Sequence, residues 1–335
     1  MEKTTMDDVA KRANVSVATV SRVYSNPDKV SPKNRQKVYE AIKELDYQPN
    51  VLARNLRRLQ TNTFLVVVPN IVNTFFTSIL KTIQATAIES GYQVLLGDTN
   101  RSPDLEESYI RLLKQRMVDG VILLFPRMET AALEAIAEEY PVVIVGRKVS
   151  NPDIPFVTND NAVSTRAATE HIIKLGHRRI GYLAGTLNLE ISSERLKGFR
   201  QAMEQNGLET DEALIREGDF YLDAGYSLAL EMLSSPNRPT AVIAASDEMA
   251  IGAMRAAKEL GISVPSQLAV MGFDDIRMAS ICEPPLSTIA QPKEEFGKIS
   301  TQLLIALLQG RLQSKSHIFI SDELIIRQSC GAELR

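Results

Sequence analysis

The stretch MDDVAKRANVSVATVSRV, residues 6–23, decides how the N-terminal segment folds. Thr5 can cap a first helix, and Asn14-Val15 can form a tight turn after that helix. Ser16 can cap a second helix, which we expect over residues 17–24. Two short helices joined by a tight turn indicate a helix-turn-helix.

A third helix is predicted from Pro32 to about Asp46, because Ser at the N-cap followed by Pro at N1 favours a helix start. The second helix would enter the major groove of DNA. Arg22 suits a guanine, since its fork matches O6 and N7, and Val17 and Ala18 suit thymine methyl groups. A small helical bundle that binds protein is the alternative. The predicted DNA contacts of this segment, phosphate contacts included, are Thr5, Ser16, Val17, Ala18, Thr19, Ser21, Arg22, Asn34 and Arg35.

The next segment, NVLARNLRRL at residues 50–59, is basic and helix-prone. Isolated helices this short are marginal in water, so we expect it to fold only against DNA and a second copy of the chain. Leu56 would then be an apolar wedge in the minor groove, with Arg54 and Arg57 on the backbone. Asn50 and Ala53 complete the predicted contacts. A solvated linker helix is the alternative.

Charge is divided unevenly along the chain. Residues 1–60 hold 12 Lys and Arg against 7 Asp and Glu, a net of +5, whereas residues 61–335 hold 26 against 34, a net of -8. A basic segment on an acidic body suits a protein that meets phosphate at one end only. Chance variation over a short segment is the alternative.

Several protein classes are disfavoured. The 335 residues contain no apolar run of about 18 residues and no N-terminal signal peptide. Cys282 and Cys330 lack CxxC spacing, which fits a reducing bacterial cytoplasm and neither a disulfide framework nor a zinc finger. No nucleotide-binding glycine loop, HExxH or GxSxG appears, so the sequence predicts a protein that is not an enzyme and needs no cofactor or metal. A secreted sugar-binding protein would carry a secretion signal in place of the basic helical segment, and a sugar kinase would need a phosphate-binding glycine loop, so both are disfavoured. A protein adaptor, which would lack salt-sensitive DNA binding, is disfavoured as well.

Residues 61–335 alternate apolar runs with amphipathic helices. Expected strands cover 64–69, 92–97, 121–125, 142–146, 179–184, 241–245 and 268–273, and expected helices cover 76–90, 104–115, 129–139, 162–175, 193–205, 222–233 and 248–260. Continuous apolar strands alternating with helices indicate parallel sheets covered on both faces. Two such series predict an α/β core of two doubly wound lobes.

Ligands of such sheets bind beyond the carboxyl ends of the strands, where several unusual side chains are expected. An Asp beside an Arg can hold hydroxyl groups through charge-assisted bonds, so Asp274 with Arg195 is our candidate site for a sugar or ribose. Phe75 would stack on a ring or belong to the core. Asp247 would contact the ligand or cap the following helix.

These motifs resemble the LacI/GalR family of bacterial repressors. The matching stretches are residues 6–23, 47–50, 53–56, 118–120, 176–177, 272–274 and 285–292. The resemblance implies a homodimer that binds a palindromic operator through a hinge helix and represses, or occasionally activates, transcription. NPDKVS at 26–31 and ELIIR at 323–327 are most similar to the cytidine-repressor branch.

The resemblance also implies a periplasmic-binding-protein-like core. The expected domains are 1–48, a hinge at 49–60, and a core at 61–335 whose lobes cover about 61–160 with 291–320 and 161–290 with 321–335. The effector-contacting positions are Asn73, Phe75, Leu189, Ile191, Arg195, Phe220, Asp247, Asp274 and Gln291. Leu189 stands where purine-sensing relatives carry arginine, which favours a nucleoside or neutral sugar over a charged or purine-base effector. A carbohydrate-responsive or catabolite-control regulator with a phosphoprotein co-regulator is the alternative.

Overall fold

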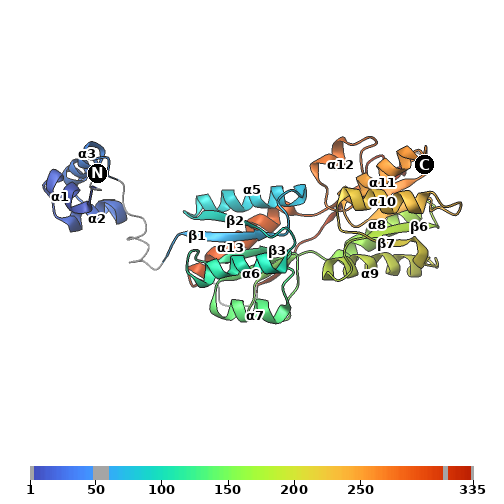
Figure 1. Ribbon diagram of the computed structural model, residues 1–335, viewed down its shortest axis with the longest axis horizontal. Helices are drawn as coiled ribbons and strands as arrows, with labels where there is room; N and C mark the ends of the chain where they lie inside the picture. The colour runs from blue at the N-terminus through green and yellow to red at the C-terminus, as the bar shows by residue number, and fades with distance from the viewer. Residues whose placement is uncertain (1–3, 48–59, 312–315, 333–335) are drawn as a thin grey trace. The chain divides into compact units, whose positions relative to one another are not determined.

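The computed structural model describes residues 4–47, 60–311 and 316–332. The chain forms two compact units, which we call unit 1 (residues 1–60) and unit 2 (residues 61–335) (Figure 1). In the part of the chain that the structure describes, no helix has the length and apolar character needed to cross a bilayer.

Unit 1 contains the three predicted helices, α1 (Met6–Ala13), α2 (Val17–Ser25) and α3 (Pro32–Glu44), with a 3-10 turn, η1 (Pro27–Lys29), between the last two. Thr5 and Asp8 form a reciprocal capping box at the start of α1. Asn14 ends this helix in the left-handed conformation, with φ of 52°. Ser16 and Ser31 cap the next two helices through their hydroxyl oxygens.

The core of unit 1 comes from the inner faces of these helices. Its buried residues are Val9, Ala10, Ala13, Val20, Val23, Val30, Val38, Ala41 and Tyr47. The apolar positions recur at helical spacing, so each helix turns one apolar stripe inward. The outer face of α2 is therefore left to solvent.

The first lobe of unit 2 is built on a parallel sheet with the strand order β11-β5-β4-β3-β1-β2. Its elements are β1 (Thr63–Val68), α5 (Thr74–Glu89), β2 (Gln93–Asp98), α6 (Pro103–Lys114), β3 (Val121–Leu124), α7 (Thr130–Glu139), β4 (Val142–Val145), β5 (Phe156–Thr158), α13 (Lys293–Leu308) and β11 (His317–Phe319). Figure 1 shows α5 on one side of the sheet and α6 and α7 on the other.

The apolar run of β1 explains this layering. Phe64, Val66 and Val68 pack into the cluster beneath α5 and α13. Leu65 and Val67 pack into the cluster with α6 and α7. Alternate side chains of a strand point to opposite faces, so a strand covered on both faces is apolar throughout.

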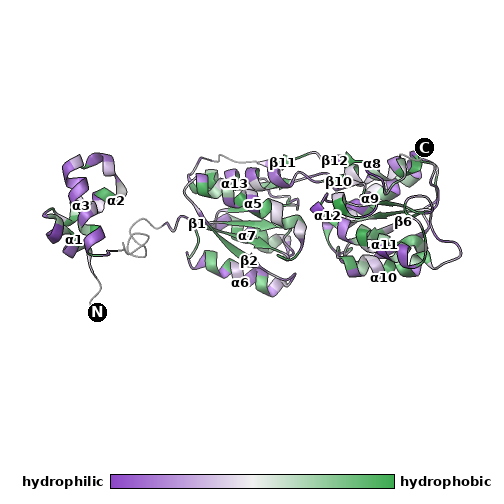
Figure 2. Cartoon of the chain, turned by 90° about the horizontal axis from the view of Figure 1, so that it is seen from above, coloured by the Kyte–Doolittle hydropathy of each residue, from purple (hydrophilic) through white to green (hydrophobic). Residues whose placement is uncertain are grey.

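The second lobe repeats this plan with the parallel order β7-β6-β8-β9. Its elements are α8 (Asn161–Lys174), β6 (Ile180–Ala184), α9 (Glu190–Gln205), η2 (Glu212–Leu214), β7 (Ile215–Glu217), α10 (Leu222–Leu233), β8 (Ala241–Ala244), α11 (Asp247–Glu259), β9 (Ala269–Met271) and α12 (Arg277–Ile281). In Figure 2 the inner strands of both lobes are mostly hydrophobic, and the outer helices contain both hydrophobic and hydrophilic residues.

The α/β architecture with two parallel-sheet lobes is confirmed, and the predicted helices and strands begin and end within three residues of the observed ones. The sequence prediction missed α12, α13, β5, β7 and β11, and the antiparallel pair β10 (Thr288–Ala290) and β12 (Glu323–Ile325). The five missed strands have three residues each. A segment of that length cannot show a hydrophobic period, so only its neighbours in space define it.

Candidate functional site

A cavity of about 70 Å³ lies at the carboxyl ends of the strands, where residues of both lobes of unit 2 meet. Eight of the nine predicted effector-site residues line it: Asn73, Phe75, Leu189, Ile191, Arg195, Phe220, Asp274 and Gln291. A second cavity of about 210 Å³ shares Phe125, Arg127, Leu189 and Ile191 with the first. The two cavities therefore adjoin along these four residues.

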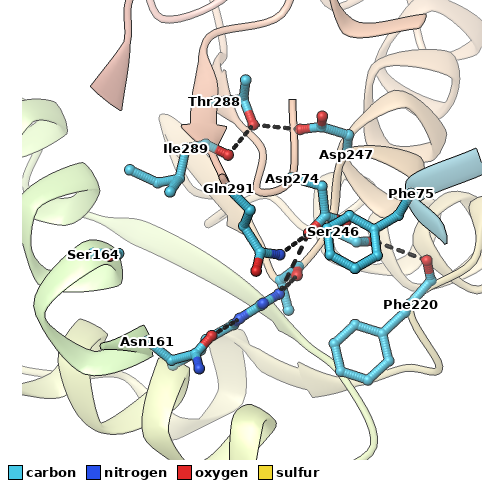
Figure 3. Close-up of polar contacts among 12 residues, drawn as sticks. Phe75, Asn161, Ser164, Phe220, Ser246, Asp247, Asp274, Thr288, Ile289 and Gln291 are labelled. Atoms are coloured by element: carbon cyan, nitrogen blue, oxygen red, sulfur yellow. Dashed lines mark hydrogen bonds and ion pairs between the residues drawn. The ribbon is translucent and has the colours of Figure 1, made fainter. Parts of the chain in front are cut away.

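The apolar part of the cavity is aromatic. The Phe75 ring is 5 % exposed and makes edge-on contacts with the rings of Phe76, at 5.2 Å, and Phe125, at 5.6 Å. Phe220 has a φ of 75°, a strained value for a bulky residue. A Cβ on Gly185 would lie 2.1 Å from the Phe220 ring, so this glycine makes room for the ring. Figure 3 shows the rings of Phe75 and Phe220 beside the polar cluster.

Arg195 is held rigidly at the polar end of the cavity. It is 2 % exposed, and its Nε donates to Asn161 Oδ1 at 2.8 Å while a terminal nitrogen donates to the Ala245 carbonyl. The guanidinium also lies 3.6 Å from the centroid of the Phe273 ring. A buried cation with these partners can donate only in fixed directions.

Asp274 and Gln291 form the acceptor side of the cavity (Figure 3). Gln291 Nε2 donates to Asp274 Oδ1 at 2.6 Å, and a terminal nitrogen of Arg195 lies 3.9 Å from the same oxygen. Burial raises the pKa of Asp274 to about 6 even though Arg195 and Gln291 oppose that rise. Gln291 Oε1 is buried and has no hydrogen-bond partner among the described residues. This pair can thus accept hydrogen bonds from hydroxyl or N–H groups of a ligand.

Asp247, the ninth predicted residue, does not line the cavity. It is fully buried, and its carboxylate accepts a hydrogen bond from the Ile276 N–H at 2.8 Å. It also accepts one from the Thr288 hydroxyl, which Figure 3 shows. The alternative prediction, that Asp247 caps the following helix, is wrong, because Ser246 is the N-cap of α11. Asp247 thereby connects Ile276, in the loop after β9, with Thr288 of β10. This connection positions Asp274 and Gln291, which belong to the same two segments.

The sequence analysis missed charged residues that reach the cavity from loops. Arg101 follows β2 in the first lobe, and it pairs with Asp219 of the second lobe at 3.5 Å and lies over the Tyr221 ring at 4.6 Å. Arg127 follows β3 and lines both cavities. No periodic pattern marks such residues in a sequence; only their position after the strands could have suggested them.

A further ion pair joins the lobes away from Asp274. Lys148, which follows β4 in the first lobe, donates to Glu194 on α9 of the second lobe. Among the described residues it is one of two ion pairs between the lobes, the other being Arg101–Asp219. Both pairs must break if the lobes separate.

In unit 1 the structure turns several predicted DNA contacts outward. Ser16, Val17, Ala18 and Arg22 are exposed, and Thr19 and Ser21 are partly exposed. Val17 is 42 % exposed at the first position of α2, which is a high value for an apolar residue. The outward face of α2 thus presents small and apolar groups in its first turn and the basic Arg22 in the next, the kinds of group that contact base edges.

The other predicted contacts have structural partners already. Thr5 caps α1, and the partly buried Arg35 forms an ion pair with Asp28 at 3.7 Å. Asn34 gives its backbone N–H to the Ser31 cap. Asn50, Ala53, Arg54, Leu56 and Arg57 lie outside the described residues.

Within the described ranges, no group of three or more His, Cys, Asp or Glu residues could hold a metal ion.

Comparisons with known proteins agree with this architecture. Residues 5–50 match the family "Bacterial regulatory proteins, lacI family", and residues 169–330 match the periplasmic binding protein-like domain. The HTH-type transcriptional repressor CytR of Escherichia coli K12 is 39% identical over 329 residues, 98% of this chain and 96% of the relative. The HTH-type transcriptional regulator DegA of Bacillus subtilis 168 is 38% identical over 331 residues, 98% of each chain.

A solved structure extends the similarity to three dimensions. The lac repressor dimer bound to operator and the anti-inducer ONPF has a TM-score of 0.89 and 30% identity, with 98% of this chain and 99% of that chain covered. The similarity therefore includes both units of the chain.

Proposed function

This chain belongs to the LacI family of DNA-binding transcriptional regulators, and we propose that it binds a palindromic operator as a dimer and responds to a small effector held in unit 2. The observation that carries the proposal is the outward face of α2, at whose N-terminus Ser16, Val17 and Ala18 are exposed with Arg22 one turn further. In a helix-turn-helix this part of the second helix meets the base edges. The net charge of +5 on residues 1–60 attracts the DNA backbone.

The cavity of unit 2 supports an effector that combines a ring with hydroxyl groups, such as a nucleoside or a sugar. Phe75 and Phe220 offer ring faces and edges, and Asp274 and Gln291 offer acceptors. The related lac repressor structure holds the anti-inducer ONPF. We propose that the cavity binds its ligand and does not transform it, as fits the transcriptional regulators to which this chain is similar.

Effector binding would act through the contact between the lobes. The Arg101–Asp219 and Lys148–Glu194 pairs hold the two lobes together around a cavity of about 70 Å³. A ligand that fits one arrangement of the lobes better raises the population of that arrangement. The size of this shift is limited by the difference between the ligand's affinities for the two arrangements. The operator affinity of the dimer changes by the same coupling free energy.

The test begins with selection of operator sequences from a random DNA library by the full chain. We expect an inverted repeat whose half-sites lie about one helical turn apart, bound with an affinity that falls steeply with salt. A thermal-shift screen of nucleosides and sugars then seeks ligands that raise the melting temperature. Asp274→Asn should remove that shift without removing operator binding. Failure to enrich any sequence would refute the DNA-binding proposal.

A further inference from the structure

Arg127 occupies an unusual position in unit 2. It lies in the loop between β3 and α7 and lines both adjoining cavities. Its side chain is partly buried. Within the described part of the chain its guanidinium has no hydrogen bond or ion pair, although its backbone N–H donates to Glu106.

The charges around the first cavity do not balance. Among the described residues, five charged side chains line it: Arg101, Arg127, Arg195, Asp219 and Asp274. Four of them form two ion pairs, Arg101 with Asp219 at 3.5 Å and Arg195 with Asp274 at 3.9 Å. Arg127 is left as the one cation without a partner in this set.

Nearby carboxylates do not supply that partner. Glu106 accepts hydrogen bonds from the main-chain N–H groups of Arg127 and Met128, and burial raises its pKa. The charge of Arg147 opposes that rise more strongly than the charge of the Arg127 guanidinium does. Glu129 and Glu190 line the second cavity but are exposed to solvent. Burial and the positive charge of Arg101 lower the pKa of the Arg127 guanidinium, and the smaller opposing effects of Tyr221 and Glu106 do not offset them.

From this arrangement we infer that Arg127 is a subsite for an anionic group, a phosphate or a carboxylate, carried by the effector. The inference rests on the effector role proposed for the cavity. A planar guanidinium binds either anion through two parallel hydrogen bonds. Leu189 and Ile191 line the same junction and reduce its contact with water, which strengthens such a bond.

This inference revises the effector class expected from the sequence. The absence of arginine at Leu189 favoured a neutral effector, but Arg127 brings a guanidinium to the same cavity from the other lobe. A ligand whose hydroxyl groups meet Asp274 and Gln291 and whose anion meets Arg127 would contact both lobes at once. Such a ligand would favour the arrangement in which the two lobes of unit 2 are closed around it.

The experiment uses matched neutral and anionic compounds. Full-length protein is screened by thermal shift, and binding is measured by calorimetry, with nucleosides and their 5′-monophosphates, hexoses and hexose phosphates, and hexoses and hexuronates. We expect at least one anionic member to bind more tightly than its neutral counterpart. Arg127→Gln should weaken that member on the order of tenfold to a hundredfold, the range of a charge-assisted hydrogen bond, and leave the neutral member unchanged.

Two controls separate the anion subsite from other effects. Arg111→Gln removes the same charge from the exposed face of α6 and should change no affinity. Arg127→Gln should melt, without ligand, at the wild-type temperature or above it, because it removes an unpaired, partly buried cation. A large fall in that melting temperature would show a structural role and overturn the inference.

The remaining outcomes are also decisive. If neutral compounds bind through Asp274 and no anionic compound gains from Arg127, the subsite is refuted while the effector role of the cavity stands. If no compound in the panel binds, both fail. If phosphates alone or carboxylates alone show the Arg127-dependent gain, the subsite is supported and its anion is identified.

Discussion

Replacing Gln291 by methionine should separate the stability of the cavity from its affinity for ligand. The Gln291 amide makes two opposed contributions to the free energy of unfolding. Its Nε2 donates to Asp274 Oδ1 at 2.6 Å, whereas its Oε1 is buried without a hydrogen-bond partner among the described residues. A hydrogen bond to a charged group contributes about 1.5–3 kcal/mol, and a buried unsatisfied oxygen costs about 1–3 kcal/mol.

These contributions nearly cancel, and methionine fills a similar volume with a flexible apolar chain. We therefore expect the free energy of unfolding without ligand to change by less than about 1 kcal/mol, a shift of a few degrees in melting temperature. The effector would instead lose the acceptor Oε1. Its affinity should fall roughly 5- to 150-fold, which corresponds to about 1–3 kcal/mol.

Thermal unfolding followed by fluorescence measures the first quantity, and calorimetry with a ligand from the screen measures the second. Gln205→Met, at an exposed position of α9, is the matched control and should change neither. Unchanged ligand affinity in Gln291→Met would refute the acceptor role of Gln291. A loss of several kcal/mol in unfolding free energy without ligand would show that the donor lost to Asp274 outweighs the unsatisfied Oε1, and would refute the cancellation.

Three further predictions concern the DNA surface, the acidic end of the cavity and its aromatic wall. Arg22→Ala should relax base choice at one operator position by about 1–3 kcal/mol, measured by anisotropy on operators changed at single positions; an equal loss on every sequence would instead mark a phosphate contact. Effector affinity should fall as pH drops through about 6, because Asp274 then gains a proton and accepts less well; calorimetry between pH 5 and 8 should show this step, and an affinity that does not change over this range would refute the role of the Asp274 charge. Gly185→Ala should cost about 1–3 kcal/mol of stability by overpacking, since its Cβ would lie 2.1 Å from the Phe220 ring; unchanged thermal unfolding would show that the ring moves freely.

The sign of the pH effect distinguishes binding from unfolding. Burial raises the pKa of Asp274 from 3.8 to about 6, so the folded protein holds this proton more tightly than the unfolded chain does. The stability from this group is complete below about pH 3.8 and is lost as pH rises through about 6. Loss of effector affinity below pH 6 therefore cannot come from unfolding caused by Asp274.

Local sequence patterns determined most of the architecture. The apolar run at 64–68 identifies a strand buried on both faces, and Thr5, Ser16 and Pro32 identify the starts of the helices in unit 1. Caps and periodic burial depend on neighbours within a few residues, which the sequence displays directly. The rule that ligands bind beyond the carboxyl ends of parallel strands, together with the family resemblance, then placed eight of the nine expected residues at the cavity.

Only the tertiary structure decided what those residues do together. Asp247 looked like a ligand contact, yet it holds Thr288 and Ile276 beneath the site. Arg101 and Arg127 carry no local signal, because a charged residue in a loop has the same appearance in a sequence whether it meets solvent or a cavity. Ion pairs between residues 101 and 219 and between 148 and 194, and the unpaired charge of Arg127, arise from contacts between segments distant in sequence, and these exist only once the lobes have folded.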